Sequence, residues 1–188
     1  MPDLIVIGGP NGAGKSTWAP WLLRDTLGIV DFVNADTLAA GLSAYHTESV
    51  AMRAGRLALQ RLHELIRTGQ SCAFESTLSG RSLATVVRQA TDAGYAFTLA
   101  FIWLPSPDLS VARVADRVRR GGHDISEHII RRRYHRGLRN LHEAYLPLAH
   151  RWFVYNSAGH LPEIVAMGRL HETATVHNQT AWRQILEA

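Results

Sequence analysis

The chain has 188 residues, of which 46% are hydrophobic and 19% are charged, with a net charge of +4. This balance excludes an intrinsically disordered chain and fits a globular domain that can bury a core. The longest apolar run, residues 96–105, is too short to span a bilayer, and the single Cys72 excludes a disulfide framework and a zinc site built from cysteines. The N-terminus lacks the features of a secretory signal, so we expect a cytoplasmic protein without a membrane partner.

A glycine-rich stretch directly follows the first predicted strand. Residues 4–7 are a short, β-branched apolar run, and residues 9–17 read GPNGAGKST. This stretch matches G-x-x-x-x-G-K-[ST], the phosphate-binding loop (P-loop), and residues 16–27 have the pattern of the helix that should follow it. Backbone amides of such a loop and the N-terminus of its helix hold nucleotide phosphates. The predicted nucleotide-binding residues are Gly9, Pro10, Asn11, Gly12, Ala13, Gly14, Lys15, Ser16 and Thr17.

Lys15 is the only lysine in the chain, so all other residues in the Lys+Arg total of 20 are arginines. A compact ammonium on a flexible stem suits a phosphate cradle better than a planar guanidinium does. We therefore predict that Lys15 is a catalytic residue at the γ-phosphate and that the Ser16 hydroxyl is a ligand of Mg²⁺. ATP and Mg²⁺ are the expected cofactors.

Two further predicted strands lead into acidic residues. Residues 29–33 are followed by Asp36, and residues 71–74 are followed by Glu75. Because ligands of open α/β sheets bind at the carboxyl ends of the strands, both carboxylates are expected at the site. Asp36 is the predicted base for the acceptor hydroxyl, with a helix-capping aspartate as the alternative. Glu75 is expected to hold Mg²⁺ or acceptor hydroxyls and Thr77 to lie beside it, with plain turn residues as the alternative for both.

Helical spacing predicts a helix over residues 47–68 with Thr47 as its N-cap, and further helices over 82–93, 107–120 and 127–149. Strands are predicted over 96–104 and 151–155. The helical pair at 107–149 is expected to form a lid that is rich in arginine. A guanidinium fork suits phosphate oxygens, although many arginines on such helices only form a solvated face. The predicted catalytic lid residues are Arg117, Arg120 and Arg133, the last of which lies on the apolar side of its helix.

The alternation of strands and helices predicts an α/β P-loop NTPase fold. The expected core is a parallel five-stranded sheet in the kinase-like order 2-3-1-4-5, with helices on both faces and the helical lid. We expect one domain over residues 1–188. A small β/α appendage is expected at about 159–188, with a hairpin over 163–176 and a helix over 180–186.

Several motifs together resemble those of the zeta-toxin-like small kinases of the P-loop class. They are the loop at 9–17, Asn34-Ala35-Asp36, the FESTLSG stretch at 74–80, Arg117-Val118 with Gly121-Gly122-His123, Arg132-Arg133-Tyr134, Asn140-Leu141 and Asn156-Ser157. The resemblance implies ATP as the donor, Asp36 as the base, Glu75 and Thr77 as acceptor-binding residues, and two lid arginines. It implies a nucleotide sugar as one acceptor, because the sugar-kinase members phosphorylate a UDP-activated amino sugar. A toxin role does not follow from it, and no antitoxin or regulatory partner is identified.

The predicted function is therefore an ATP-dependent kinase that transfers the γ-phosphate to a hydroxyl of a small molecule. A GTPase is disfavoured because its guanine-binding motif needs a second lysine, and an ABC-type ATPase because Arg81 follows Leu78-Ser79-Gly80 where that signature needs Gly-Gln. An ATP-binding regulatory protein without a dedicated acceptor stays open as the alternative. A nucleic-acid end kinase is favoured only by the basic charge, so nucleic acid is not the expected partner.

Overall fold

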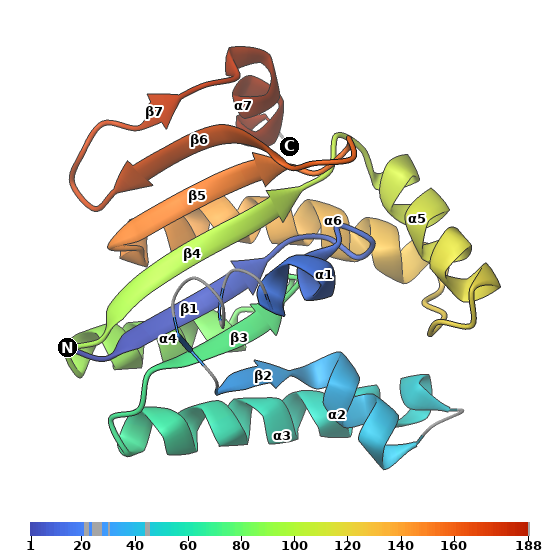
Figure 1. Cartoon of the computed structure of the whole chain (residues 1–188), viewed down its shortest axis with the longest axis horizontal. Coiled ribbons are helices and arrows are strands. Elements are labelled where there is room, and N and C mark those ends of the chain that lie inside the picture. The colour runs from blue at the N-terminus through green and yellow to red at the C-terminus, as the bar shows by residue number, and fades with distance from the viewer. Residues whose placement is uncertain (21–22, 24–27, 30, 44–45, 188) are drawn as a thin grey trace.

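The computed structural model describes residues 1–20, 23, 28–29, 31–43 and 46–187. Its described part contains a seven-stranded sheet (Figure 1). The strands are β1 (Asp3–Gly8), β2 (Phe32–Asn34), β3 (Cys72–Ser76), β4 (Ala96–Trp103), β5 (Arg151–Asn156), β6 (Glu163–Arg169) and β7 (Thr175–Val176). Their order across the sheet is β2-β3-β1-β4-β5-β6-β7.

The first five strands form the parallel part of the sheet, with β1 at its centre. β1 pairs in parallel with β3 on one side and with β4 on the other. Leu4, Ile5, Val6 and Ile7 are all buried, as expected for a strand that is covered on both faces. The P-loop therefore follows the carboxyl end of a buried central strand.

The prediction of a parallel five-stranded sheet was wrong in two respects, the number of strands and the assumption that all of them are parallel. The parallel strands have the predicted order, but β6 pairs antiparallel with β5 and β7 pairs antiparallel with β6, so the sheet is mixed. The sequence predicted a local hairpin over 163–176, and a hairpin pattern does not reveal which sheet edge it will extend. The last helix supports this edge, since Trp182 stacks on Trp152 of β5 with ring centroids 5.5 Å apart.

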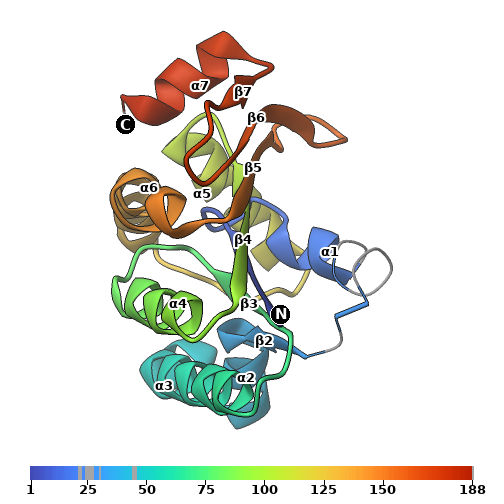
Figure 2. The ribbon, with the colours of Figure 1, turned by 90° about the vertical axis from the view of Figure 1, so that its left-hand side faces the viewer.

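Helices cover both faces of the sheet, as the sequence predicted. They are α1 (Lys15–Pro20), α2 (Ala35–Leu42), α3 (Thr47–Arg67), α4 (Ser82–Asp92), α5 (Pro107–Arg119), α6 (Glu127–Asn140) and α7 (Gln179–Leu186). Figure 2 views the sheet nearly edge-on, with α3, α4 and α6 along one face and α1 on the other. In Figure 1, α5 extends beyond the carboxyl ends of the parallel strands, on the side where the P-loop lies.

One helix was not predicted, two predicted helix boundaries need correction, and the first helix is described only in part. α2 was not predicted; the Asn34 side chain caps it by accepting hydrogen bonds from the amides of Asp36 and Thr37. The N-cap of α3 is His46, not Thr47. The helix predicted over 127–149 is α6 only to Asn140, followed by a π-helical segment (Leu141–Tyr145) and a 3₁₀ turn (Leu146–Leu148). Pro147 lies in that turn, where it cannot continue an α-helix. Beyond Pro20, most of the helix predicted over 16–27 lies outside the described residues.

Cys72 is completely buried in β3. Burial, with a smaller contribution from the negative charge of Asp31, raises the pKa of its thiol to about 11. The reactive thiolate is therefore scarce below that pH and forms only as the pH rises past it. We expect a thiol reagent such as DTNB to leave the native protein unlabelled at pH 8 and to label one thiol per chain after unfolding in guanidinium. Rapid labelling of the native protein would contradict the burial of this strand.

Among the described residues, none of the helices combines the length and the apolar character needed to cross a bilayer.

Candidate active site

The P-loop curves away from the end of β1 on glycines with positive φ angles. These angles are 145° at Gly9, 77° at Gly12 and 86° at Gly14, a region that side chains with a Cβ rarely adopt. At Gly9 there is no room either, because a Cβ would lie 2.2 Å from the carbonyl oxygen of Ile102 in β4. The loop wraps around the ammonium of Lys15, which donates a hydrogen bond to the carbonyl of Pro10 at 3.0 Å. A glycine-rich loop that leads into a helix N-terminus is a typical binding site for phosphate groups.

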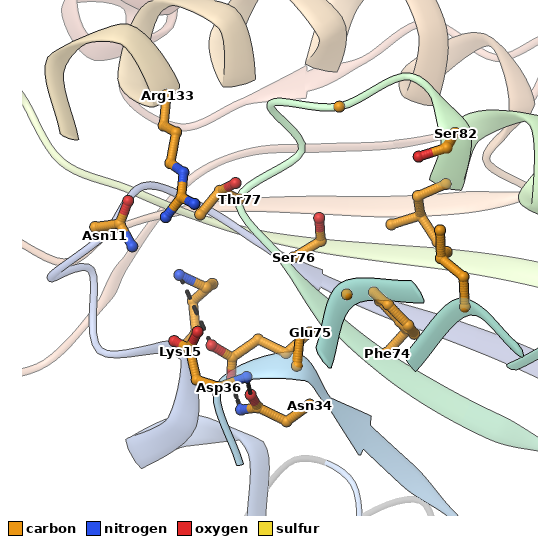
Figure 3. Close-up of a pocket in the computed structure, with 15 residues that line it drawn as sticks. Asn11, Lys15, Asn34, Asp36, Phe74, Glu75, Ser76, Thr77, Ser82 and Arg133 are labelled. Carbon is orange, nitrogen blue, oxygen red and sulfur yellow. Dashed lines mark hydrogen bonds and ion pairs between the residues drawn. The ribbon is translucent and has the colours of Figure 1, made fainter. Parts of the chain in front are cut away.

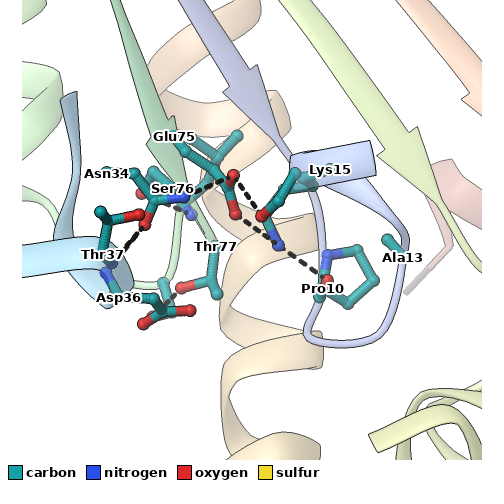
Figure 4. A network of polar contacts seen from close by, with 12 residues as sticks. Pro10, Ala13, Lys15, Asn34, Asp36, Thr37, Glu75, Ser76 and Thr77 are labelled. Carbon is teal, nitrogen blue, oxygen red and sulfur yellow. Dashed lines mark hydrogen bonds and ion pairs between the residues drawn. The ribbon is translucent and has the colours of Figure 1, made fainter. Parts of the chain in front are cut away.

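The carboxylate of Glu75 connects the P-loop with the neighbouring strands (Figure 4). Its Oε2 accepts hydrogen bonds from the Ser16 hydroxyl at 2.8 Å and from Nδ2 of Asn34 at 2.9 Å. Its Oε1 lies 3.8 Å from Nζ of Lys15, and both side chains are 8% exposed. Glu75 is thus in contact with the two P-loop side chains expected at the γ-phosphate and the metal.

Burial lowers the pKa of the Lys15 ammonium below its usual value. The negative charges of Glu75 and Asp36 oppose this effect, while the positive charges of Arg117 and Arg133 add to it. Four charged side chains therefore act on this one buried ammonium. Phosphate groups bound beside it would add further negative charge in a place that is shielded from water. Negative phosphate charge at this place would favour the charged form of Lys15.

Asp36 lies in the first turn of α2, immediately after the end of β2. Its backbone amide is fixed by the Asn34 side chain at 2.8 Å. The carboxylate of Asp36 is exposed and lines both cavities at the carboxyl edge of the sheet. Asn34 therefore has two contacts, since one end of its amide caps α2 and the other binds Glu75. The sequence indicated Asp36 but not this use of Asn34, although an asparagine before a short helix is a common N-cap.

Two cavities meet at the P-loop. One has a volume of about 540 Å³ and lies between the loop and α5; the residues lining it include Gly14, Ser16, Thr17 and three lid arginines. The other has a volume of about 210 Å³ and lies between the loop and the elements β2, β3, α3 and α6. Asn11, Lys15, Asp36 and Glu75 line both cavities. This shared wall is where a group could pass from a molecule in the first cavity to a molecule in the second.

The lid arginines differ in how the structure holds them. Nη2 of Arg117 donates to the carbonyl of His123 at 2.8 Å, while its Nε is buried and has no hydrogen-bond partner among the residues that the structure describes. Arg120, the C-cap residue of α5, pairs with Asp116 of that helix at 2.7 Å, and its side chain is 79% exposed. Both line the larger cavity, whereas Arg133 from α6 lines the smaller one. In Figure 3 the guanidinium of Arg133 points toward Asn11 and Thr77.

Arg113 was not among the predicted site residues, although it also lines the larger cavity. Its guanidinium donates to the hydroxyl and the carbonyl of Ser157 at 3.2 and 2.6 Å and to the carbonyl of Ala158 at 3.0 Å. The Ser157 hydroxyl in turn donates to the carbonyl of Ala13 in the P-loop at 2.8 Å. This chain of contacts fixes the lid helix α5 to the P-loop. No sequence signal pairs residues this far apart.

The structure thus brings the predicted site residues together at one edge of the sheet. Lys15, Asp36, Glu75, Thr77 and Arg133 line the smaller cavity, and Thr77 Oγ1 lies 2.9 Å from the Ser79 hydroxyl. Arg120 lies farther out on the surface of the lid. The buried Oδ1 of Asn11, which has no hydrogen-bond partner in the described part of the chain, also lies at the shared wall. This oxygen could accept a hydrogen bond from a donor that enters the cavities.

Comparison with known proteins identifies the family. A family profile described as an AAA domain matches residues 4–139, which include the P-loop, Asp36, Glu75 and most of the lid. The chain belongs to this family. An uncharacterized protein of Haemophilus influenzae is 32% identical over 126 residues, which cover 67% of this chain and 88% of that protein.

Solved structures with this fold include a chain of a toxin-antitoxin system and a chain of a complex with ATP. A chain of the PezAT chromosomal toxin-antitoxin system of Streptococcus pneumoniae matches with a TM-score of 0.70 at 19% identity, over 100% of this chain and 80% of that chain. A chain of the AvrRxo1-ORF1:-ORF2 complex with ATP matches with a TM-score of 0.72 at 19% identity, over 98% of this chain and 63% of that chain. At 19% identity, these similarities concern the fold. At the level of the fold, they confirm the resemblance to the zeta-toxin-like P-loop kinases.

Proposed function

We propose that this AAA-family chain is an ATP-dependent kinase that transfers the γ-phosphate to a hydroxyl of a small molecule. The observation that supports this most is the wall shared by the two cavities, where Lys15, Asp36 and Glu75 lie together. The larger cavity would take the phosphates of ATP, and the smaller one would take the acceptor. The ATP complex of the AvrRxo1 neighbour, which has the same fold, is consistent with the donor.

In the proposed reaction each side chain has a limited task. The P-loop amides and Lys15 hold the β- and γ-phosphates and neutralise their charge. The Asp36 carboxylate accepts the proton of the acceptor hydroxyl as its oxygen forms the new bond to phosphorus. The bond from phosphorus to the β–γ bridging oxygen breaks, and ADP leaves. Arg133 stabilises the charge on the transferred group from the acceptor side, and Arg117 and Arg120 act from the lid.

The residues at the P-loop fit a magnesium ion. Mg²⁺ binds proteins through one or two oxygen ligands and otherwise keeps waters and substrate phosphates. The Ser16 hydroxyl and the Glu75 carboxylate, 2.8 Å apart, supply such oxygens. When bound there, the ion would neutralise phosphate charge. The Ser16 hydroxyl would bind the ion directly, and the Glu75 carboxylate would orient both Ser16 and the water molecules bound to the ion.

Replacing Glu75 with glutamine tests this assignment. The change keeps the size of the side chain but removes the negative charge that faces Ser16 and Lys15. We expect the concentration of Mg²⁺ needed for half-maximal ADP formation to rise by about 10- to 100-fold. The matched control is Glu143→Gln, which removes an exposed carboxylate that pairs with Arg81 on the surface. An unchanged Mg²⁺ requirement in the Glu75→Gln protein would refute the role of Glu75 at the metal.

Replacing Arg133 with alanine tests the acceptor side. Because this guanidinium lines the smaller cavity, we expect kcat to fall by about 10²- to 10³-fold while the affinity for ATP changes little. The neighbouring Arg132 is exposed, so Arg132→Ala removes the same charge from the same helix as a control. Steady-state kinetics with varied ATP separate the two effects. A variant with normal kcat and a raised KM for ATP would place Arg133 in nucleotide binding instead.

A further inference from the structure

Ser157 is a buried residue that contacts both the P-loop and the lid. It follows β5 directly and is 6% exposed. Its hydroxyl donates a hydrogen bond to the carbonyl of Ala13 in the P-loop at 2.8 Å and accepts one from Nη1 of Arg113 in α5 at 3.2 Å. Its amide donates to the carbonyl of Trp103 in β4 at 2.9 Å, so the sheet fixes its position. This hydroxyl has no chemical task in the proposed transfer.

The guanidinium of Arg113 is occupied by contacts within the protein. Besides the bond to the Ser157 hydroxyl, its Nη2 donates to the carbonyls of Ser157 and Ala158 at 2.6 and 3.0 Å. Both terminal nitrogens therefore have acceptors, and all of these acceptors are neutral. The carboxylate of Asp116 on the same helix pairs with Arg120 instead. Arg113 thus differs from an arginine whose fork is free for phosphate oxygens, and its contacts fix the place of α5.

α5 also approaches the P-loop directly, at Gly12. A Cβ on Gly12 would lie 3.0 Å from the Cβ of Arg113 and 3.0 Å from the carbonyl oxygen of Ser110. The φ angle of 77° already favours glycine at this position, and the close approach of the helix is a second reason for it. Arg113 therefore lies against the P-loop at its Cβ and against Ser157 at its guanidinium. Ser157 holds α5 at the point where helix and loop meet.

The position of Arg117 depends on the position of α5. It lies four residues after Arg113, so the two side chains lie on the same face of the helix, and both line the larger cavity. Its Nη2 donates to the carbonyl of His123 at 2.8 Å, and a Cβ on Gly122 would lie 2.6 Å from its Cγ. The turn after α5 therefore holds the Arg117 side chain in place relative to its own helix. Its distance from the P-loop is then set by where α5 as a whole lies.

A small apolar cluster joins α5 to the start of α6. Val114, Ile125 and Ile130 are buried and pack together, separately from the main core. Among the described residues, the main core includes one side chain of α5, the half-buried Leu109. Few apolar contacts therefore place the lid relative to the sheet. The hydrogen bonds to Ser157 carry more of this task.

We propose that Ser157 is a positioning residue for phosphoryl transfer. Its hydroxyl acts through Arg113 and the Ala13 carbonyl, and it holds α5 so that Arg117 faces the phosphates bound by the P-loop. The inference rests on the proposed kinase function and adds to it a residue that does not touch the reacting atoms. A misplacement of about 1 Å in a catalytic group can cost about 10²-fold in rate, so the loss of this contact should be measurable.

Ser157→Ala tests the inference by kinetics. ADP formation from ATP is measured with glycerol, glucose and UDP-N-acetylglucosamine as acceptor probes and with water alone. With the probe that gives the native chain its highest rate, we expect kcat to fall about 10- to 100-fold, while the Kd of ATP from calorimetry changes by less than about threefold. Ser157→Thr keeps the hydroxyl and should restore most of the rate. Ser110→Ala is the matched control, because it removes a buried hydroxyl of α5 that has no hydrogen-bond partner among the described residues.

A double-mutant cycle separates the positioning of Arg117 from general damage to the fold. If Ser157 acts by placing Arg117, Ser157→Ala should lower kcat by less than about threefold in a chain that already carries Arg117→Ala. Losses that multiply would mean that Ser157 acts on another part of the site. That result would overturn the inference and leave the kinase function in place.

Hydrogen exchange supplies a readout that does not depend on turnover. We expect the amides of α5, residues 107–119, to exchange about tenfold faster or more in Ser157→Ala than in the native chain, with those of α4 unchanged. Unchanged exchange in α5 would overturn the inference whatever the rates are. Faster exchange in α5, together with a native chain that forms no ADP with any probe or with water, would count against the proposed kinase function and against the task of Ser157 in it.

Discussion

Replacing Lys15 with methionine is expected to reduce phosphoryl transfer by about 10³-fold or more. The ammonium is buried in the curve of the P-loop, bound to the Pro10 carbonyl and facing Glu75. Methionine keeps most of the aliphatic stem, so the loop loses a charge but little packing. The uncompensated carboxylates of Glu75 and Asp36 would then repel the phosphates of ATP.

Two measurements check this expectation. ADP formation, with the best acceptor of the native chain, should become hard to detect, and calorimetry should show weaker binding of ATP. Arg88→Met is the matched control, because it removes one positive charge from an exposed position of α4. Lys15→Met with transfer within a few-fold of native would mean that the phosphate site lies elsewhere.

Asp36→Asn should lower the rate of transfer by about 10²- to 10⁴-fold, with ATP bound as before. Asparagine has the same shape as aspartate, and the cap that holds the start of α2 comes from the Asn34 side chain, so the helix should keep its position. What disappears is the proton acceptor at the wall between the two cavities. Asp92→Asn at the exposed end of α4 serves as the control.

This variant also separates two classes of protein. A kinase with a dedicated acceptor needs the base, whereas a regulatory ATP-binding protein that hydrolyses ATP slowly has little use for it. If the single-turnover rate of Asp36→Asn equals that of the native chain, Asp36 is not the base and the regulatory function becomes the better interpretation.

The P-loop and the edge of the sheet where the site lies could be predicted because their signals are local. Gly9, Gly14 and Lys15 are fixed by backbone geometry and phosphate chemistry within one short motif. Asp36 and Glu75 follow from a simple rule, since the carboxyl ends of parallel strands meet at one edge. The position of Arg133 followed from the apolar stripe of α6, in which the buried Ile130 and Tyr134 set the rotation of the helix.

The parts that could not be predicted depend on contacts between distant residues. The contact of Ser16 with Glu75 joins residues 59 positions apart, and that of Asn34 with Glu75 joins residues 41 positions apart. The addition of β6 to the edge of β5 depends on which sheet edge is free, which no local pattern records. Arg120 is the exposed C-cap residue of α5, where no apolar stripe fixes the direction of its side chain.

The most direct test of the account is a calorimetric titration of the native chain with ATP in the presence and absence of Mg²⁺. We predict saturable binding of one ATP per chain that Mg²⁺ strengthens and that Lys15→Met weakens markedly. Absence of measurable ATP binding to the folded native chain at millimolar nucleotide would contradict the phosphate site, and with it the proposed function.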